Sequence, residues 1–277
     1  MVSPGNGFAL VAPASKGLGF AFAQQLLSHT NLPVIATARR NCDEVRDSLL
    51  KAVKSRSGDP RERLRVLQMD VTDESTIQAM ASHIRGEYPD AALRIAITVP
   101  GILHVEKSPS QIDAASALNS YKVNALGPML LMKHLAPFLP TKSSKPFLVD
   151  SQPRKDDCSW NLPSHAIYAM MAARVGSISD NATGGWYSYR ASKASVFQIA
   201  KTFDLYLRTR SNDRALAIAM HPGTVQTDFT KEYWDGRNML QPLDSANRLL
   251  QFLCTMEPGN NDGRGRCWDW KGEEVLP

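Results

Sequence analysis

The sequence predicts an α/β protein with a single doubly wound parallel sheet and helices on both faces. Short, almost continuously apolar runs, suited to buried parallel strands, alternate with longer helix-like stretches. The 277 residues are 43% hydrophobic and 21% charged, which is typical of a folded globular protein. Because α/β folds of this length commonly share one core, we expect residues 1–277 to form a single domain.

Six strands and two long helices can be placed in chain order. The strands are expected at residues 8–12, 33–38, 64–69, 93–99, 166–175 and 215–220. Residues 20–28 supply the first crossover helix, and residues 188–210 supply a long late one. Residues 141–164 are expected to form an inserted loop, and residues 229–243, rich in aromatic side chains, a substrate lid. An ordinary surface loop is the alternative for each.

Composition and charge exclude several classes of protein. No basic opening precedes an apolar run, and no segment approaches about 18 uninterrupted apolar residues, so we expect a cytoplasmic protein without a membrane partner. The four cysteines form no C-x-x-C pair, which argues against a metal site and a disulfide framework. The net charge of +5 is dispersed, without an aromatic-studded basic stripe, and no nucleic-acid partner is expected.

A glycine-containing turn at residues 12–19 (APASKGLG) joins the first strand to the first helix. A Rossmann-like dinucleotide fold needs such a turn, where backbone N–H groups and a helix N-terminus face a pyrophosphate. Gly17 and Gly19 permit the close approach of the backbone. Plain turn chemistry is the alternative. The residues expected to bind the cofactor here are Ser15, Lys16 and Leu18.

The residues after the second strand indicate which dinucleotide is bound. Folds that bind NAD place an acidic residue there to hold the ribose 2′-hydroxyl, whereas this chain has Arg39 and Arg40. A guanidinium suits the 2′-phosphate of NADP through charge-assisted hydrogen bonds. Arg39, supported by Lys16, therefore predicts NADP(H), with two merely solvated arginines as the alternative.

Tyr189 and Lys193 stand four residues apart at the start of the long late helix, so they share one helical face. A free phenol has a pKa of about 10, and an adjacent ammonium is expected to lower it toward the range of an acid–base catalyst. The wider string 184–194 (GGWYSYRASKA) closely resembles short-chain dehydrogenases/reductases of the C-factor and sniffer carbonyl-reductase type, fungal members especially. Tyr187 lies on another face and is expected to serve packing.

This resemblance implies roles for residues elsewhere in the chain. Turn 12–19 is similar to the family's T-G-x-x-x-G-x-G motif, with Ala12 and Pro13 in place of the Thr and the first Gly. Asp70 lies in a D-V-T motif whose Asp contacts adenine in the family. An ordinary helix cap nearby, at Thr72 or Asp73, is compatible with that role.

Two further motifs complete the resemblance. It implies that Asn124 distorts its helix and holds a water linked to Lys193, with a plain polar helix residue as the alternative. It also implies that the Val225 backbone and the Thr227 hydroxyl fix the nicotinamide amide, and that Lys193 binds the nicotinamide ribose. Residues 98–101 keep only Gly101 of the family's N-N-A-G motif.

The family's catalytic Ser at the end of the fifth strand has no clear counterpart. Aligning the string Gly176-Ser177-Ile178 with its relatives puts Ala172 or Ala173 at that position, which is the alignment we favour. Counting back from Tyr189 by the family's usual spacing gives Ser177 instead. Loss of one preorganised donor costs about 10²–10³ in rate. The site then either works slowly, uses Ser177 or Ser179, or serves another reaction.

The resemblance implies an NADP(H)-dependent oxidoreductase that interconverts a carbonyl and an alcohol on a small, fairly apolar substrate. Tyr189, Lys193 and Asn124 are the expected catalytic residues, and Tyr189 and Lys193 also contact the cofactor. Alternatives on the same scaffold are an isomerase, dehydratase or cyclase of secondary metabolism, or a cofactor-binding regulator. By family analogy the chain forms a homodimer or homotetramer.

Overall fold

The computed structural model describes residues 6–53, 59–149, 160–233, 239–259 and 263–277. Its strands form one sheet in the order β3-β2-β1-β4-β5-β6-β7-β8, and only the β7–β8 pair is antiparallel. The strands are β1 (Phe8–Ala12), β2 (Val34–Ala38), β3 (Leu64–Gln68), β4 (Leu93–Thr98), β5 (Ala166–Met171), β6 (Ala215–His221), β7 (Cys267–Asp269) and β8 (Glu274–Val275). The predicted fold class is confirmed.

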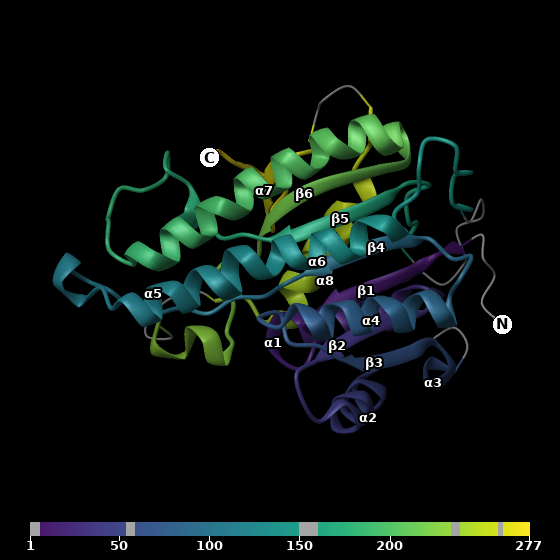
Figure 1. Ribbon diagram of the computed structural model, residues 1–277, viewed down its shortest axis with the longest axis horizontal. Coiled ribbons are helices and arrows are strands. Elements are labelled where there is room, and N and C mark those ends of the chain that lie inside the picture. Colours follow the sequence, from purple (N-terminus) through teal and green to yellow (C-terminus); the bar gives the residue numbers. More distant parts are fainter. Residues whose placement is uncertain (1–5, 54–58, 150–159, 234–238, 260–262) are drawn as a thin grey trace.

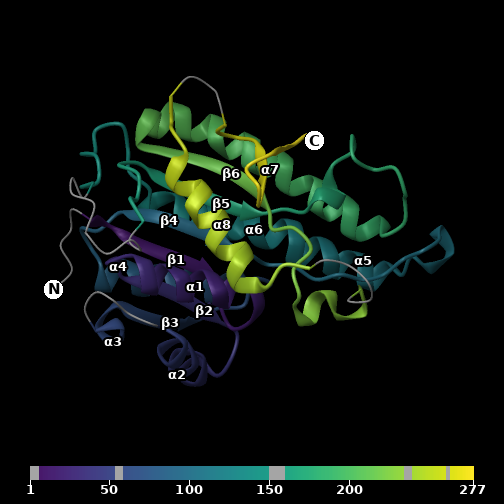
Figure 2. The same ribbon diagram turned by 180° about the vertical axis from the view of Figure 1, so that it is seen from behind.

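Helices cover both faces of this sheet (Figures 1 and 2). Figure 1 shows α4, α6 and α7 in front of the strands, and Figure 2 shows α1 and α8 on the opposite face. The helices are α1 (Gly17–His29), α2 (Cys42–Ala52), α3 (Pro60–Arg63), α4 (Glu74–Glu87), α5 (Ala114–Tyr121), α6 (Gly127–Leu135), α7 (Tyr187–Ser211) and α8 (Pro242–Thr255). Within the described residues, none of these helices has the length and apolar character needed to span a bilayer.

The strands divide their side chains between two cores, because successive residues of a strand point to opposite faces. In β1, Phe8 and Leu10 belong to the core beneath α4, α6 and α7, while Ala9 and Val11 belong to the core beneath α1 and α8. All five residues of β1 are fully buried. The near-continuous apolar runs in the sequence are therefore explained by burial on both faces.

The six predicted strands are present with small differences in their ends, except that β5 stops at Met171 rather than at residue 175. After β5 the chain turns through a short 3₁₀ segment, Arg174–Gly176, which packs against α7. A Cβ at Gly176 would lie 2.7–2.9 Å from backbone atoms of Lys193 and Ala194. The apolar run in the sequence does not predict this close approach of Gly176 to α7.

The predicted inserted loop lies partly outside the described residues. Residues 141–149 and 160–164 form neither helix nor strand, and Cys158 falls in the segment that is not described. Arg94, which is buried, donates to the carbonyl oxygens of Leu148 and Leu162 at 3.0 Å each. These bonds attach the described ends of the loop to β4, at the amino end of that strand.

Candidate active site

Lys193 joins the carboxyl ends of two adjacent strands. It lies in the second turn of α7 and is 3% exposed. Its Nζ donates to the carbonyl oxygen of Met171 at 2.9 Å, at the end of β5, and to that of Pro100 at 3.3 Å, just after β4. Burial lowers the pKa of Lys193 to about 8. A ligand at this sheet edge would thus meet an ammonium held by neutral acceptors rather than by a carboxylate.

Tyr189 lies between two aromatic side chains. It is 6% exposed, with the ring of Trp186 at 6.1 Å and that of Phe229 at 6.0 Å between centroids. Burial raises the pKa of the Tyr189 phenol above its ordinary value. We expected Lys193 to lower the pKa of Tyr189, and that prediction is wrong for this structure. Burial raises the pKa, and the Lys193 ammonium donates to two carbonyl groups instead. Tyr189 therefore stays a neutral phenol over the physiological pH range.

Asn124 lies in a π-helical turn (Lys122–Leu126) between α5 and α6. Its Oδ1 accepts from the Ile102 N–H at 2.8 Å, and its Nδ2 donates to the Ile102 carbonyl at 2.9 Å and to Ser192 Oγ at 3.0 Å. π-turns of this kind often occur at functional sites. The helix is distorted where the resemblance implied, and Asn124 ties the segment after β4 to α7.

The predicted phosphate-binding turn precedes α1 as expected. Lys16 is the residue before the helix and provides no side-chain cap. The first backbone hydrogen bond of the helix runs from the Phe20 N–H to the Lys16 carbonyl at 3.3 Å, which leaves the N–H groups of the first turn available to an anion. Ser15 and Lys16 are exposed, and Leu18 is half-buried. Lys16 Nζ lies 3.3 Å from Asp228 Oδ2, a contact between the turn and the segment after β6.

The turn has no room for a side chain at Gly19. A Cβ there would collide with the Pro13 carbonyl oxygen and approach Val99 Cγ2 to 3.0 Å. Gly19→Ala should destabilise the protein by about 1–3 kcal/mol, the usual cost of overpacking, and weaken NADPH binding, since the turn must move. Urea unfolding and NADPH fluorescence titration measure both effects.

Gly86→Ala is the matched control, because a Cβ at Gly86 in α4 has nothing within 4 Å. This change should stabilise the helix by roughly 0.5–1 kcal/mol. Wild-type NADPH affinity and stability in Gly19→Ala would contradict the role given to this glycine.

The adenosine end of the predicted site lies after β2 and β3. Asp70 Oδ1 accepts from the N–H and the Oγ1 of Thr72, both at 2.8 Å. Burial raises the pKa of Asp70, but the Thr72 hydrogen bonds and the charges of Arg39 and Lys122 outweigh this and lower it overall. Asp73, not Asp70, caps α4 by accepting from the Ser75 N–H at 3.0 Å. Asp70 is thus an anion close to Arg39 and independent of the helix cap.

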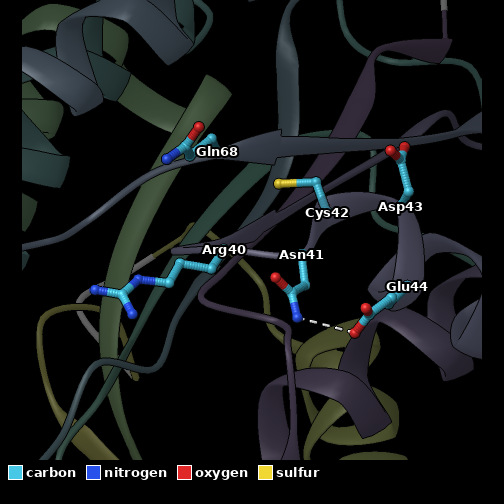
Figure 3. A pocket seen from close by; sticks show the side chains of 6 residues that line it. All are labelled: Arg40, Asn41, Cys42, Asp43, Glu44 and Gln68. Carbon is cyan, nitrogen blue, oxygen red and sulfur yellow. Dashed lines mark hydrogen bonds between the residues drawn. The ribbon is translucent and has the colours of Figure 1, made fainter.

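A pocket of about 500 Å³ opens beside this end (Figure 3). In Figure 3 the Arg40 guanidinium extends along one side of it, and Asn41 bonds Glu44 at 2.9 Å. Arg39 is exposed and its carbonyl accepts from Gln68 Nε2 at 3.3 Å. The structure therefore brings Gln68 to the end of the sheet where the sequence predicts Arg39 and Arg40. The residues that line this pocket are Arg40, Asn41, Cys42, Asp43, Glu44 and Gln68.

Val225 and Thr227 lie in the segment that follows β6. Val225 is buried and forms a parallel bridge with Leu240, and the Gln226 N–H donates to the Leu240 carbonyl at 2.9 Å. The Thr227 carbonyl accepts from the Thr230 N–H at 3.0 Å. These contacts join the segment just before predicted lid 229–243 to Leu240 within it, and the last two residues of that range already belong to α8. Residues 234–238, which include Trp234, lie outside the described residues.

The side chains of both candidate Ser residues are engaged in hydrogen bonds within the protein. Ser177 is 2% exposed, and its Oγ accepts from the Asp180 N–H at 3.0 Å. Ser179 Oγ donates to the Pro277 carbonyl at 2.6 Å. Ala172 and Ala173 directly follow β5, next to the Met171 carbonyl that Lys193 binds. This placement favours the alignment that puts an alanine at the family's Ser position.

The comparisons with known proteins identify the family of this chain. The family model described as short chain dehydrogenase matches residues 7–145, and the chain belongs to this family of oxidoreductases. A relative is 1-hydroxy-2-glutathionyl-2-methyl-3-butene dehydrogenase of Rhodococcus sp. (strain AD45), 27% identical over 192 residues, with 69% of this chain and 71% of that protein covered.

Solved structures of carbonyl reductases share the fold. Carbonyl reductase Sniffer of D. melanogaster superimposes with a TM-score of 0.77 at 20% identity, covering 98% of this chain and all of the other. The NADPH-bound carbonyl reductase from chicken fatty liver has a TM-score of 0.77 at 22% identity, covering 98% and 99%. The predicted resemblance to sniffer-type carbonyl reductases is confirmed at the level of fold.

Proposed function

We propose that this chain is an NADP(H)-dependent reductase of small, fairly apolar carbonyl compounds. The observation that carries the proposal is the set of Tyr189, Lys193 and Asn124 at the carboxyl ends of β4 and β5. Family membership and the NADPH-bound neighbour from chicken liver support a nicotinamide cofactor. The aromatic rings of Trp186 and Phe229 beside Tyr189 support an apolar substrate.

The residues present fit such a cofactor. The uncapped first turn of α1 suits a pyrophosphate, Asp70 and Arg39 suit the adenosine end, and Lys193 suits the nicotinamide ribose. When bound, the cofactor supplies the hydride that reduces the carbonyl carbon. Val225 and Thr227 would hold its amide, and lid residues 229–243 would exclude water from the site.

Tyr189 acts as the general acid. Its buried, neutral phenol gives the proton to the carbonyl oxygen, and so the product is an alcohol. Lys193 stays cationic below about pH 8, and its ammonium would bind the ribose hydroxyls of the cofactor. Asn124 keeps the segment after β4, with Pro100 and Ile102, against α7. With alanine at residues 172 and 173, no serine hydroxyl follows β5 directly to polarise the substrate.

The function is tested by NADPH oxidation against a panel of apolar ketones and aldehydes. Turnover that needs Tyr189 is expected. Tight NADPH binding without turnover would instead favour a regulator. Substrate conversion without net NADPH consumption would favour an isomerase, dehydratase or cyclase, the alternative that Ala172 and Ala173 motivate. We also propose a single-domain, cytoplasmic homo-oligomer.

Arg39→Asp should lower the ratio of NADPH to NADH efficiency. Charge-assisted hydrogen bonds contribute about 1.5–3 kcal/mol, so the ratio of kcat/KM values should fall about 10- to 100-fold. Lys51→Asp, an equal change of charge at the far end of α2, should leave the ratio unchanged. An unaltered ratio in Arg39→Asp would refute the assignment of Arg39 to the 2′-phosphate. The same measurement on Arg40→Asp would show whether the neighbouring guanidinium binds the phosphate instead.

A further inference from the structure

Helix α7 carries both Tyr189 and Lys193 yet begins without a cap from its own sequence. The residue before it, Trp186, is in the left-handed region at φ 52°, and its side chain does not cap the helix. The first N–H groups of a helix have no partner within the helix. The Tyr189 phenol stands only two residues from this end, so its position depends on what holds the first turn.

Glu106, 82 residues earlier in the chain, supplies the missing acceptors. Its Oε2 accepts from the Ser188 N–H at 2.7 Å, and its backbone carbonyl accepts from the Trp186 N–H at 2.6 Å. The side chain is only 2% exposed. A carboxylate in this place satisfies an N–H group and meets the positive end of the helix dipole. The donors of these two bonds, Ser188 and Trp186, lie one and three positions before Tyr189.

The turn that carries Glu106 is itself ordered by local hydrogen bonds. Gln111 Oε1 accepts from the N–H groups of Lys107 at 2.6 Å and Ser108 at 3.2 Å. On the other side, Arg190 donates to the carbonyl groups of Gly185 at 3.0 Å and Val175 at 3.2 Å. The first turn of α7 is thus fixed between the segment after β4 and the segment after β5.

We infer that Glu106 is a positioning residue for Tyr189, acting through the first turn of α7. The inference rests on the proposed reductase function. Lys193 is one turn deeper and has its own anchors at Met171 and Pro100, so loss of the Glu106 carboxylate moves the phenol more than the ammonium. Small misplacement of a reacting group is costly in rate. The effect should therefore fall on kcat and leave NADPH binding in place.

Glu106→Leu and Glu106→Gln separate this role from a general structural one. Leucine removes the acceptor, whereas glutamine keeps one oxygen for the Ser188 N–H and puts its nitrogen where Oε1 has no hydrogen-bond partner. For Glu106→Leu we expect kcat to fall about 10-fold with the Kd for NADPH within about 3-fold. For Glu106→Gln we expect kcat close to wild type. Asp59→Leu, which removes the cap at the Arg61 N–H of α3, is the control for loss of a helix cap elsewhere.

Hydrogen exchange of the amides in residues 187–190 gives a readout independent of turnover. Faster exchange there in Glu106→Leu, and not in Glu106→Gln or Asp59→Leu, is expected. Unchanged kcat in Glu106→Leu, an equal loss in both Glu106 variants, or a parallel loss of NADPH binding would overturn the inference. Absence of carbonyl turnover in the wild type would instead refute the proposed function, and the exchange data would still decide whether Glu106 holds the turn.

Discussion

Tyr189→Phe should lower carbonyl reduction by about 10²–10⁴-fold, the usual contribution of a general acid. The change removes only the hydroxyl, and the phenyl ring can keep its contacts with Trp186 and Phe229. NADPH affinity should therefore change little. The measurement is kcat/KM for one good substrate, together with fluorescence titration of NADPH.

Tyr187→Phe is the matched control for this experiment. Tyr187 begins the same helix, but its side chain is 39% exposed. Its kcat/KM should remain within about 3-fold of wild type, as for most surface changes. If Tyr189→Phe retained full reductase activity, Tyr189 would not be the acid, and the proposed mechanism would fail.

Burial of Tyr189 also sets the direction of the pH dependence. Because its pKa is raised, the phenol remains protonated throughout the neutral range, as reduction requires. Alcohol oxidation needs the phenolate, and its rate should therefore continue to increase with pH through the alkaline range. This asymmetry favours the reductive direction near neutrality.

The sequence predicted the parts of this protein that follow from local patterns. β1 spans the same residues as its apolar run, because both faces of the strand are buried. Each end of α7 is within one residue of its expected position. The π-turn at Asn124 followed from a family motif. These features depend on burial periodicity or on a short string of residues, and both can be read along the chain.

Long-range contacts could not be predicted in this way. Nothing near Glu106 indicates that its carboxylate binds the Ser188 N–H, because the two residues meet only after β4 and β5 are paired. The direction of the Tyr189 pKa was predicted wrongly for a related reason. Spacing placed Lys193 on the same face, but burial and the carbonyl groups of Met171 and Pro100 decide the electrostatics.

The buried ammonium of Lys193 should make stability depend on pH. Its pKa falls from 10.5 to about 8 on folding, which corresponds to roughly 3 kcal/mol. Below about pH 8 both states carry the proton, and the folded state bears the full cost of the buried charge. Between pH 8 and 10.5 the unfolded chain binds the proton and the folded protein does not, so stability due to this group increases with pH.

Lys193→Met isolates this contribution, because other groups that titrate in the same range are common to both proteins. The free energy of unfolding of wild type minus that of Lys193→Met should rise by about 3 kcal/mol between pH 7.5 and 10.5. The variant leaves two carbonyl groups unpaired, which adds a constant offset but no pH dependence. Lys201→Met, an exposed lysine in the same helix, should give a flat difference. A flat difference for Lys193→Met as well would mean that Lys193 pays no cost for its burial, and that the cation of the active site is held in a more polar environment than the structure shows.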